Sequence, residues 1–194
     1  MSANTDLYDK EISGRIVGAA KSSLPVEITE RYHDLLCWID SVLDSSLRFA
    51  RPVSEFTMQR LPGYYSEGFL SASRAIICKQ CPAVPLTEFG LRDDALPSPS
   101  DAAGFTLRDV YFVTHESVDD ESTHFHELIH VVQWHILGDE CFFHLYASGL
   151  LSAGYRLSPL EEIAYDLQSR FDSDDAEFDV IMEVRRRLAN LCMP

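Results

Sequence analysis

The sequence predicts an α+β protein, mainly helical, that folds as a single domain over residues 1–194 with a small sheet beside its central helix. Apolar residues recur at helical spacing in several segments, and one stretch rich in β-branched and aromatic residues precedes the central helix. The length of 194 residues suffices for one core but is short for two. The composition, 46% hydrophobic and 24% charged, is typical of a globular protein.

The first half of the chain predicts one clear helix and a segment of short elements. Residues 1–24 are expected to form a helix or a flexible arm that docks loosely. A helix should begin at Pro25 and end before Pro52, because apolar residues recur at Ile28, Tyr32, Leu35, Leu36, Ile39, Val42 and Leu43. Aromatic and aliphatic residues punctuated by Pro and Gly predict short strands or a hairpin over residues 53–89, and residues 91–104 predict a loop.

The second half predicts one strand followed by four helices. The β-branched and aromatic residues of segment 106–114 predict the strand. Acidic residues before position 123 and Gly138 after the last apolar residues bound a helix over 123–137. Further helices are expected at residues 142–151, 158–168 and 177–191. Residues 105–170 should form the functional core of the domain.

The pattern H-E-x-x-H occurs at His126-Glu127-Leu128-Ile129-His130. Residues four apart lie one above the other on a helix, so the two imidazoles can bind one zinc ion from a single turn. The intervening Glu127 then lies beside the open coordination position, where it can act as general base. Without a metal, the motif would be two helix histidines with ordinary hydrogen bonds.

The position of the motif on its helix favours the metal site. His126, His130 and Gln133 share one stripe, whereas apolar residues cover most of the remaining circumference. A polar stripe on a helix that should be buried needs partners, and a metal ion supplies them. His124 and His135 lie almost opposite this stripe and are expected to be ordinary surface or core-edge histidines. For the other histidines, His33, His115 and His144, no ligand-spaced partner exists.

A third ligand can come from the helix that begins near Ser158. Glu161 lies at the border of the apolar face formed by Leu160, Ile163, Ala164, Leu167 and Phe171, whereas Glu162 points away from it. We therefore favour Glu161 as the ligand. Glu161 also falls three residues after Ser158, so it can instead be the acid of a capping box.

These motifs resemble the gluzincin branch of the zincin metallopeptidases, which includes thermolysin. More narrowly, the segments 126–134 and 158–165 are similar to the H-E-L-x-H-V-x-Q helix and the N-P-x-E-x-x-A-Y element of small bacterial peptidase-like proteins. The resemblance implies a zincin-like fold, one zinc ion held by His126, His130 and Glu161, and Glu127 as the base that activates water. It also implies a peptide or protein substrate that pairs with the exposed edge of the strand beside the metal helix.

The chain departs from the gluzincin pattern after the third ligand. Many gluzincins place an Asp four residues after the ligand Glu, and that position is Tyr165 counted from Glu161 but Asp166 counted from Glu162. Tyr165 is our second candidate catalytic residue, because its hydroxyl can support a ligand or the scissile carbonyl. Tyr155 and Arg156 are further candidates for stabilising the oxyanion.

Composition limits the partners and the compartment. A net charge of −15 disfavours nucleic acid and anionic membrane surfaces, both of which attract clustered Lys and Arg. The five cysteines form no disulfide framework, and the pair Cys78 and Cys81 lacks two further zinc ligands at suitable spacing. Neither a secretory signal nor a transmembrane run is evident, so a reducing cytoplasm is expected. The oligomeric state is not indicated.

The leading hypothesis is therefore a zinc metallopeptidase. The alternative is a zincin-fold module that binds or regulates and cleaves little. The intact Glu127 favours the enzyme, because a module without catalysis has no use for the base.

Overall fold

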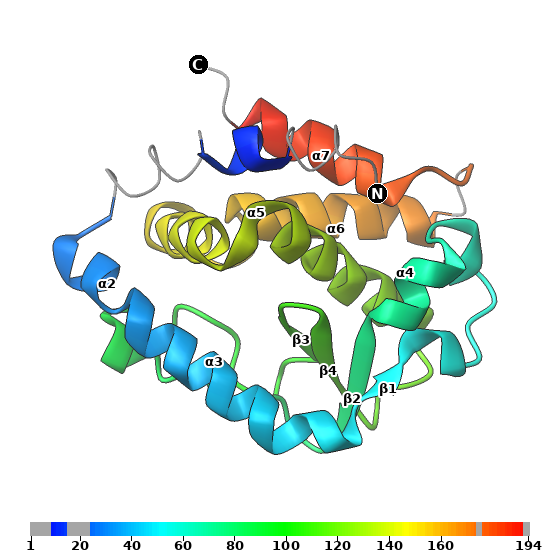
Figure 1. Ribbon diagram of the computed structural model, residues 1–194, viewed down its shortest axis with the longest axis horizontal. Helices are drawn as coiled ribbons and strands as arrows, with labels where there is room; N and C mark the ends of the chain where they lie inside the picture. Colours follow the sequence, from blue (N-terminus) through cyan, green and yellow to red (C-terminus); the bar gives the residue numbers. More distant parts are fainter. Residues whose placement is uncertain (1–8, 15–23, 174–175, 192–194) are drawn as a thin grey trace.

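The helix that carries the H-E-x-x-H motif, α5 (Glu121–Ala153), lies at the centre of the molecule (Figure 1). This computed structural model describes residues 9–14, 24–173 and 176–191. Residues 123–134 of α5 are all buried, which confirms the prediction of a core helix. On one side α5 packs against α6 (Pro159–Asp172) and α7 (Val180–Asn190), and on another against the sheet.

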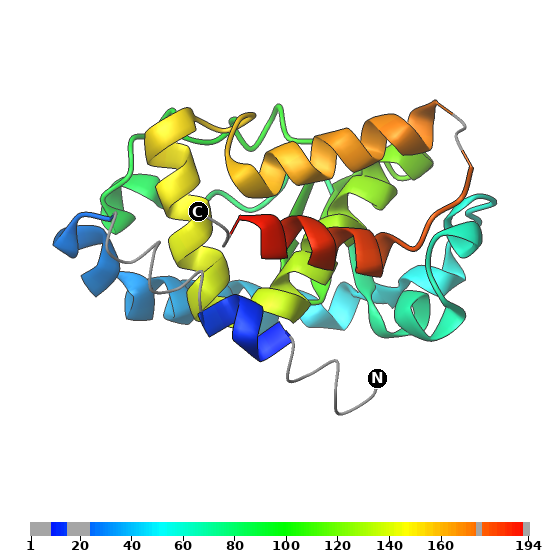
Figure 2. The same ribbon diagram turned by 90° about the horizontal axis from the view of Figure 1, so that it is seen from above.

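A sharp bend divides α5 into two helical segments. Gly138 has φ 70° and ψ 170°, a conformation that only glycine adopts readily, and Figure 2 shows the second segment leaving at a steep angle to the first. The predicted stop at Gly138 is therefore correct as the end of the motif helix. The helix predicted at residues 142–151 is the second segment of α5.

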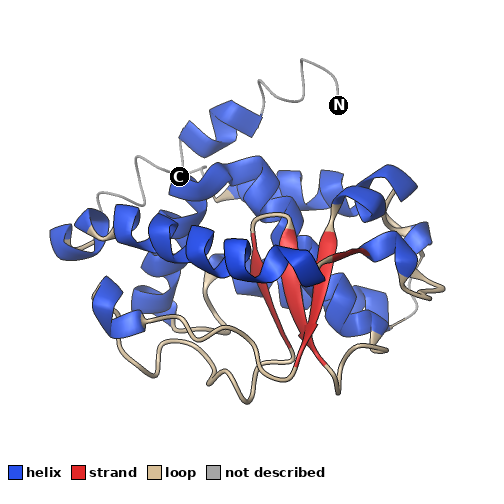
Figure 3. Ribbon diagram, turned by 60° about the horizontal axis from the view of Figure 1, so that its bottom comes forward, coloured by secondary structure: helices blue, strands red, loops and turns tan. Residues whose placement is uncertain are grey.

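The sheet has four strands in the order β1-β2-β4-β3 and mixes parallel with antiparallel pairs (Figure 3). Its members are β1 (Arg51–Pro52), β2 (Arg74–Cys78), β3 (Gly104–Leu107) and β4 (Val110–Thr114). β2 pairs in parallel with β4, whereas β1 with β2 and β3 with β4 are antiparallel. The predicted α+β class with a small sheet is thus confirmed.

The single strand predicted at residues 106–114 is wrong, because the segment is the greater part of a hairpin. β3 and β4 are joined by Arg108 and Asp109, and Arg108 has φ 57°, a value that costs an L-residue free energy. Its guanidinium group donates to Asp139 at 2.9 and 3.1 Å and to Asp40 at 2.7 Å. These ion pairs offset the cost, which explains a hairpin turn without the usual Gly or Asn.

The segment over residues 53–89 also differs from the prediction. It contains 3-10 turns at Val53–Glu55, Leu61–Gly63 and Leu86–Phe89, the helix α4 (Glu67–Ala72), and only one strand, β2. The predicted hairpin there is wrong: Ser66 accepts a hydrogen bond from the Phe69 amide and starts a helix where the aromatic content suggested a strand. The loop predicted before β3 is present.

The remaining helices follow the predictions closely. The helix expected from Pro25 to Pro52 is divided at Arg31 into α2 (Val26–Glu30) and α3 (Tyr32–Ser46), with a 3-10 turn at Leu47–Phe49. α3 lies across the sheet from α6 and α7 (Figure 1). Within the region predicted as an arm, residues 9–14 are helical, and the other positions up to 23 lie outside the described residues.

A buried ion pair connects this N-terminal helix to α7. Arg185 donates to Asp9 at 2.6 and 2.9 Å, and both residues are buried. Although α5 is long, no helix in the described ranges has a stretch apolar enough to cross a membrane.

Candidate metal centre

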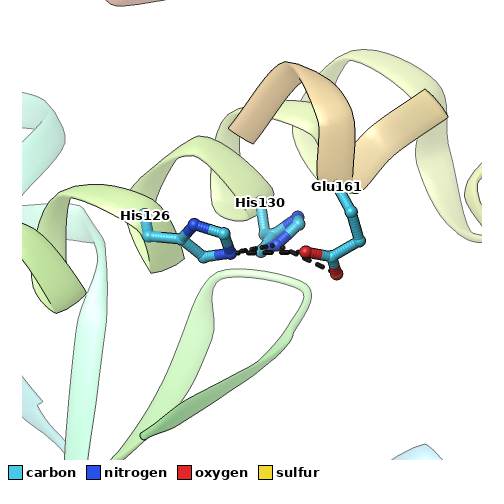
Figure 4. A group of neighbouring side chains, drawn as sticks. All are labelled: His126, His130 and Glu161. Carbon is cyan, nitrogen blue, oxygen red and sulfur yellow. Dashed lines mark hydrogen bonds and ion pairs between the residues drawn. The ribbon is translucent and has the colours of Figure 1, made fainter. Parts of the chain in front are cut away.

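His126, His130 and Glu161 converge in the core between α5 and α6 (Figure 4). The two imidazole Nε2 atoms are 3.1 Å apart, and the Glu161 carboxylate oxygens lie 3.4 Å from His126 Nε2 and 3.5 Å from His130 Nε2. All three residues are buried. The first turns of α5 supply the histidines from one face, and the first turn of α6 supplies the carboxylate.

The spacing of these atoms matches the coordination shell of a tetrahedral metal ion. Four ligand atoms at zinc bond lengths of about 2.0–2.1 Å lie roughly 3.3–3.4 Å from one another. His126 Nε2 lies 3.1 Å from His130 Nε2 and 3.4 Å from Glu161 Oε2, which agrees with this geometry, and His130 Nε2 lies 3.5 Å from the other carboxylate oxygen, Oε1. Glu161 Oε2 is buried without a hydrogen-bond partner among the described residues, which is costly unless a cation faces it. The group can therefore hold a metal ion.

Two glutamines set both imidazoles in the tautomer that a metal requires. Gln133 donates through Nε2 to the Leu160 carbonyl at 2.9 Å, so its Oε1 must face His130 Nδ1, 2.8 Å away. Gln168 donates to Ser122 Oγ at 2.9 Å, and its Oε1 lies 3.0 Å from His126 Nδ1. Each imidazole therefore carries its proton on Nδ1. Each Nε2, when unprotonated, directs its lone pair at the centre, where a metal ion can accept it.

Glu161 is aimed at the imidazoles and takes no part in capping the helix. Tyr146, from the second segment of α5, donates to Glu161 Oε1 at 2.6 Å. Without a metal ion, burial would raise the pKa of Glu161, but a protonated His130 and the close approach of His126 hold it well below its usual range. Conversely, burial would lower the pKa of His130, whereas Glu161 raises it to about 9.

The alternative ligand, Glu162, lies on the exposed face of α6. Asp166, the acid spaced for a Glu162 ligand, pairs with Arg187 at 2.6 Å. The capping box is also absent from the described contacts, because Ser158 makes no side-chain cap bond and its Oγ is buried without a partner. The inward position predicted for Glu161 from its helical face is therefore what the structure contains.

Glu127 lies beside this group and is held by the edge strand β3. Thr106 Oγ1 donates to Glu127 Oε2 at 2.6 Å, and Glu127 is 5% exposed. Burial raises the pKa of Glu127, as suits a carboxylate that accepts a proton. Gly104 allows the close approach of β3, because a Cβ atom there would meet Glu127 Oε1 at 2.5 Å.

The candidates for stabilising the oxyanion, Tyr155, Arg156 and Tyr165, occupy different positions around the centre. The Tyr165 ring lies 4.7 Å from the His126 ring, and its hydroxyl donates to the Tyr155 hydroxyl at 3.4 Å. Tyr155 lines the same cavity as Glu127, and the Arg156 guanidinium stacks over the Tyr165 ring. Burial raises the pKa of Tyr155 far above its ordinary value, so its hydroxyl remains a proton donor at neutral pH.

The other histidines do not join the centre. His135 is exposed, as expected. The expectation that His124 is a surface or core-edge residue is wrong: it is fully buried, between the Tyr111 hydroxyl at 2.5 Å and the Val118 carbonyl at 2.9 Å. Across the described ranges, only His126, His130 and Glu161 form a group of three ligand-type side chains. The thiols of Cys78 and Cys81 are free.

A cavity of about 300 Å³ adjoins the centre. Glu127, His130 and Glu161 form its polar end, and apolar side chains of α3, β3, α5 and the segment 81–99 form the rest. A buried ligand set that opens into an apolar cavity is the usual arrangement of a binding or catalytic site.

In comparisons with known proteins, no family model, no curated protein and no solved structure matches the chain.

Four residues of the centre were not assigned a role from the sequence. Gln133 lies on the metal stripe of its helix and Gln168 lies in line with Glu161, so helical spacing carried a signal for both. Thr106 and Tyr146 carried no such signal, because a hairpin and a bend in α5 bring them to the site.

Proposed function

We propose that the protein is a zinc-dependent metallopeptidase with a zincin-like arrangement of sheet and metal helix. The observation that carries the proposal is the convergence of His126, His130 and Glu161 at ligand spacing, with Glu127 on the same helix beside them. The hydrogen bonds that His130 donates to Gln133 and His126 donates to Gln168 support it, because metal-binding histidines almost always donate their second ring proton to such an acceptor.

Zinc is the ion that this set of donor atoms favours. Two imidazole nitrogens and one carboxylate oxygen suit zinc, whereas calcium and magnesium prefer oxygen alone. Three protein ligands leave a fourth position for water or substrate, as in catalytic zinc sites, whereas structural sites use four protein ligands.

The residues around the centre can each take a separate chemical role in peptide hydrolysis. Zinc, when bound, lowers the pKa of water toward neutrality and polarises a carbonyl group. Glu127 accepts the proton of the attacking water and transfers it to the leaving amine, while Thr106 fixes the carboxylate. Tyr165 or its partner Tyr155 donates a hydrogen bond to the oxyanion.

The position of β3 supports a peptide as the substrate. β3 is the edge strand of the sheet and contacts α5 directly at Glu127. An extended peptide can add to such an edge through main-chain hydrogen bonds, which would bring its scissile bond next to the candidate ligands.

Glu127→Gln tests the proposed reaction. The amide preserves the shape of the side chain but cannot accept a proton, so the variant should keep about one zinc per chain and lose hydrolysis, by at least about 100-fold. Metal analysis and mass spectrometry of a digested peptide library measure the two quantities. The exposed Glu162→Gln is the matched control and should retain both.

Two outcomes contradict the proposal. Hydrolysis that survives in Glu127→Gln would exclude Glu127 as the base. Wild-type protein that holds zinc but cleaves no peptide of the library would instead favour the binding or regulatory module.

A further inference from the structure

The cavity beside the candidate metal centre has a larger volume than one aromatic side chain of a ligand would fill. An engineered cavity of about 150 Å³ accommodates benzene, and the present one is about 300 Å³. Leu35 and Ile39 of α3, Leu86 and Phe89 of the loop region, and Phe142 of α5 are among its walls. A single aromatic side chain would leave roughly half of the volume unfilled.

The charges that line the cavity are all negative apart from a histidine. Asp93, Glu127 and Glu161 contribute carboxylates, His130 contributes its imidazole, and neither lysine nor arginine occurs among the described residues that line it. Away from the candidate metal centre, a free carboxylate in the cavity would face apolar side chains and Asp93, with no cation to pair with. This part of the cavity therefore favours an uncharged group.

One residue of the cavity wall has a buried hydrogen-bond donor without an acceptor. Trp134 lines the cavity and is 6% exposed, and its Nε1 atom is buried without a hydrogen-bond partner among the described residues. Its ring stacks on Phe142 at 3.8 Å, which fixes its orientation. Because a buried donor without a partner is costly, a ligand that supplies an acceptor oxygen gains affinity.

These features together define the ligand. We propose that the cavity binds an uncharged apolar peptide segment about two residues long, and that one of its main-chain carbonyl groups accepts a hydrogen bond from Trp134. This inference rests on the proposed peptidase function, since the segment would belong to the substrate. A fatty acid fits less well, because its chain carries no acceptor for the Trp134 N–H group.

Binding of short capped peptides tests the inference without any need for turnover. N-acetyl-leucyl-phenylalaninamide should bind the purified protein at least tenfold more tightly than N-acetyl-diglycinamide, as measured by isothermal titration calorimetry. Equal affinities for the two capped peptides overturn the proposal. So does tighter binding of decanoate than of the capped leucyl-phenylalanine peptide by chelator-treated protein, in which the decanoate carboxylate has no metal to bind.

Substitutions in the walls localise the binding. Ala147 is buried in the wall contributed by α5, so Ala147→Phe should fill the cavity and abolish the preference for the apolar peptide. Val84→Trp should also fill the cavity, from a loop, and abolish the preference. It replaces Ala147→Phe in the experiment if circular dichroism shows that the Ala147→Phe variant is unfolded. Leu151→Phe is the matched control, because Leu151 is 46% exposed on the same helix and does not line the cavity. Retained preference in a folded, filled variant contradicts the proposal.

Trp134→Phe tests the hydrogen bond separately. Phe keeps an aromatic ring in the wall but removes the N–H group, so the capped peptide should bind about fivefold more weakly. Unchanged affinity excludes Trp134 as the donor.

The outcomes of this experiment are independent of the proposed activity. Selective binding of the capped peptide together with failure of the protein to hydrolyse any peptide would leave the cavity assignment intact and remove the peptidase. Hydrolysis with no preference for apolar segments would leave the peptidase intact and remove the cavity assignment.

Discussion

The side chains of Gln133 and Gln168 determine which nitrogen of each imidazole faces the candidate metal. Both amides are oriented by acceptors on α6 or α5, so each presents Oε1 to a histidine Nδ1. Loss of such a hydrogen bond typically reduces metal affinity by about 10–100-fold without removing any ligand.

Gln168→Met tests this role at His126. Met has a similar length but offers no comparable acceptor, so zinc affinity should fall by about 10–100-fold while the protein stays folded. Competition with a chromophoric chelator measures the affinity. Asp166→Asn is the control, because Asp166 pairs with Arg187 at the surface. A loss in Asp166→Asn and none in Gln168→Met would assign the supporting role to Asp166.

Glu161→Gln and Glu162→Gln separate the two possible third ligands. Glu161→Gln should lower zinc affinity severely, because a neutral amide is a poor zinc ligand, yet the metal-free variant should fold since Gln can still accept from Tyr146. Glu162→Gln should change stability by no more than about 0.5 kcal/mol, as expected for a surface position. Chelator competition and urea unfolding give the two values, and the reverse result would make Glu162 the ligand.

At the level of elements, the bend in α5 matters most to the site. Gly138 ends the segment that carries the histidines, and the next segment returns with Tyr146, which bonds to Glu161. A straight helix would carry Tyr146 away from α6, so the bend contributes one side of the centre.

Gly138→Ala should destabilise the protein by about 1–3 kcal/mol, because its φ and ψ values lie in a region essentially restricted to glycine. The cost is conformational, since no atom lies within 4 Å of a Cβ built there. Gly68→Ala within α4 is the matched control, also with open space but in helical conformation, and it should be neutral or stabilising. Urea unfolding compares them, and equal effects would contradict the role of the bend.

At the level of the whole molecule, a bound metal would connect α5 to α6. The ligands come from residues 126, 130 and 161, so an ion held by all three is bound by the folded chain and not by the unfolded one. Binding of this kind stabilises the native state by mass action.

Zinc should therefore raise the stability of the wild-type protein by about 4 kcal/mol when its free concentration is about 1,000 times the dissociation constant. Chelation should reverse the gain, as measured by thermal unfolding. His130→Ala should show no such response, whereas His135→Ala, which changes an exposed histidine, should respond like the wild type. A full response in His130→Ala would contradict the site.

The sequence by itself determined the features that depend on a single helix. The four-residue spacing of His126 and His130, the burial of their helix and the inward direction of Glu161 all follow from helical periodicity, which is the same wherever the helix is packed. The stop at Gly138 also follows from a local preference, because glycine alone adopts its backbone conformation at low cost.

Only the tertiary structure decided which residues of separate elements meet. The distance between Glu161 and the imidazoles depends on how α6 packs against α5, and the support of Glu127 by Thr106 depends on a hairpin that the pattern of residues 106–114 did not reveal. The turn of that hairpin uses Arg108, which is stabilised by carboxylates distant in sequence. Such contacts arise from packing and charge pairing between segments, and neither is encoded in the local periodicity of the chain.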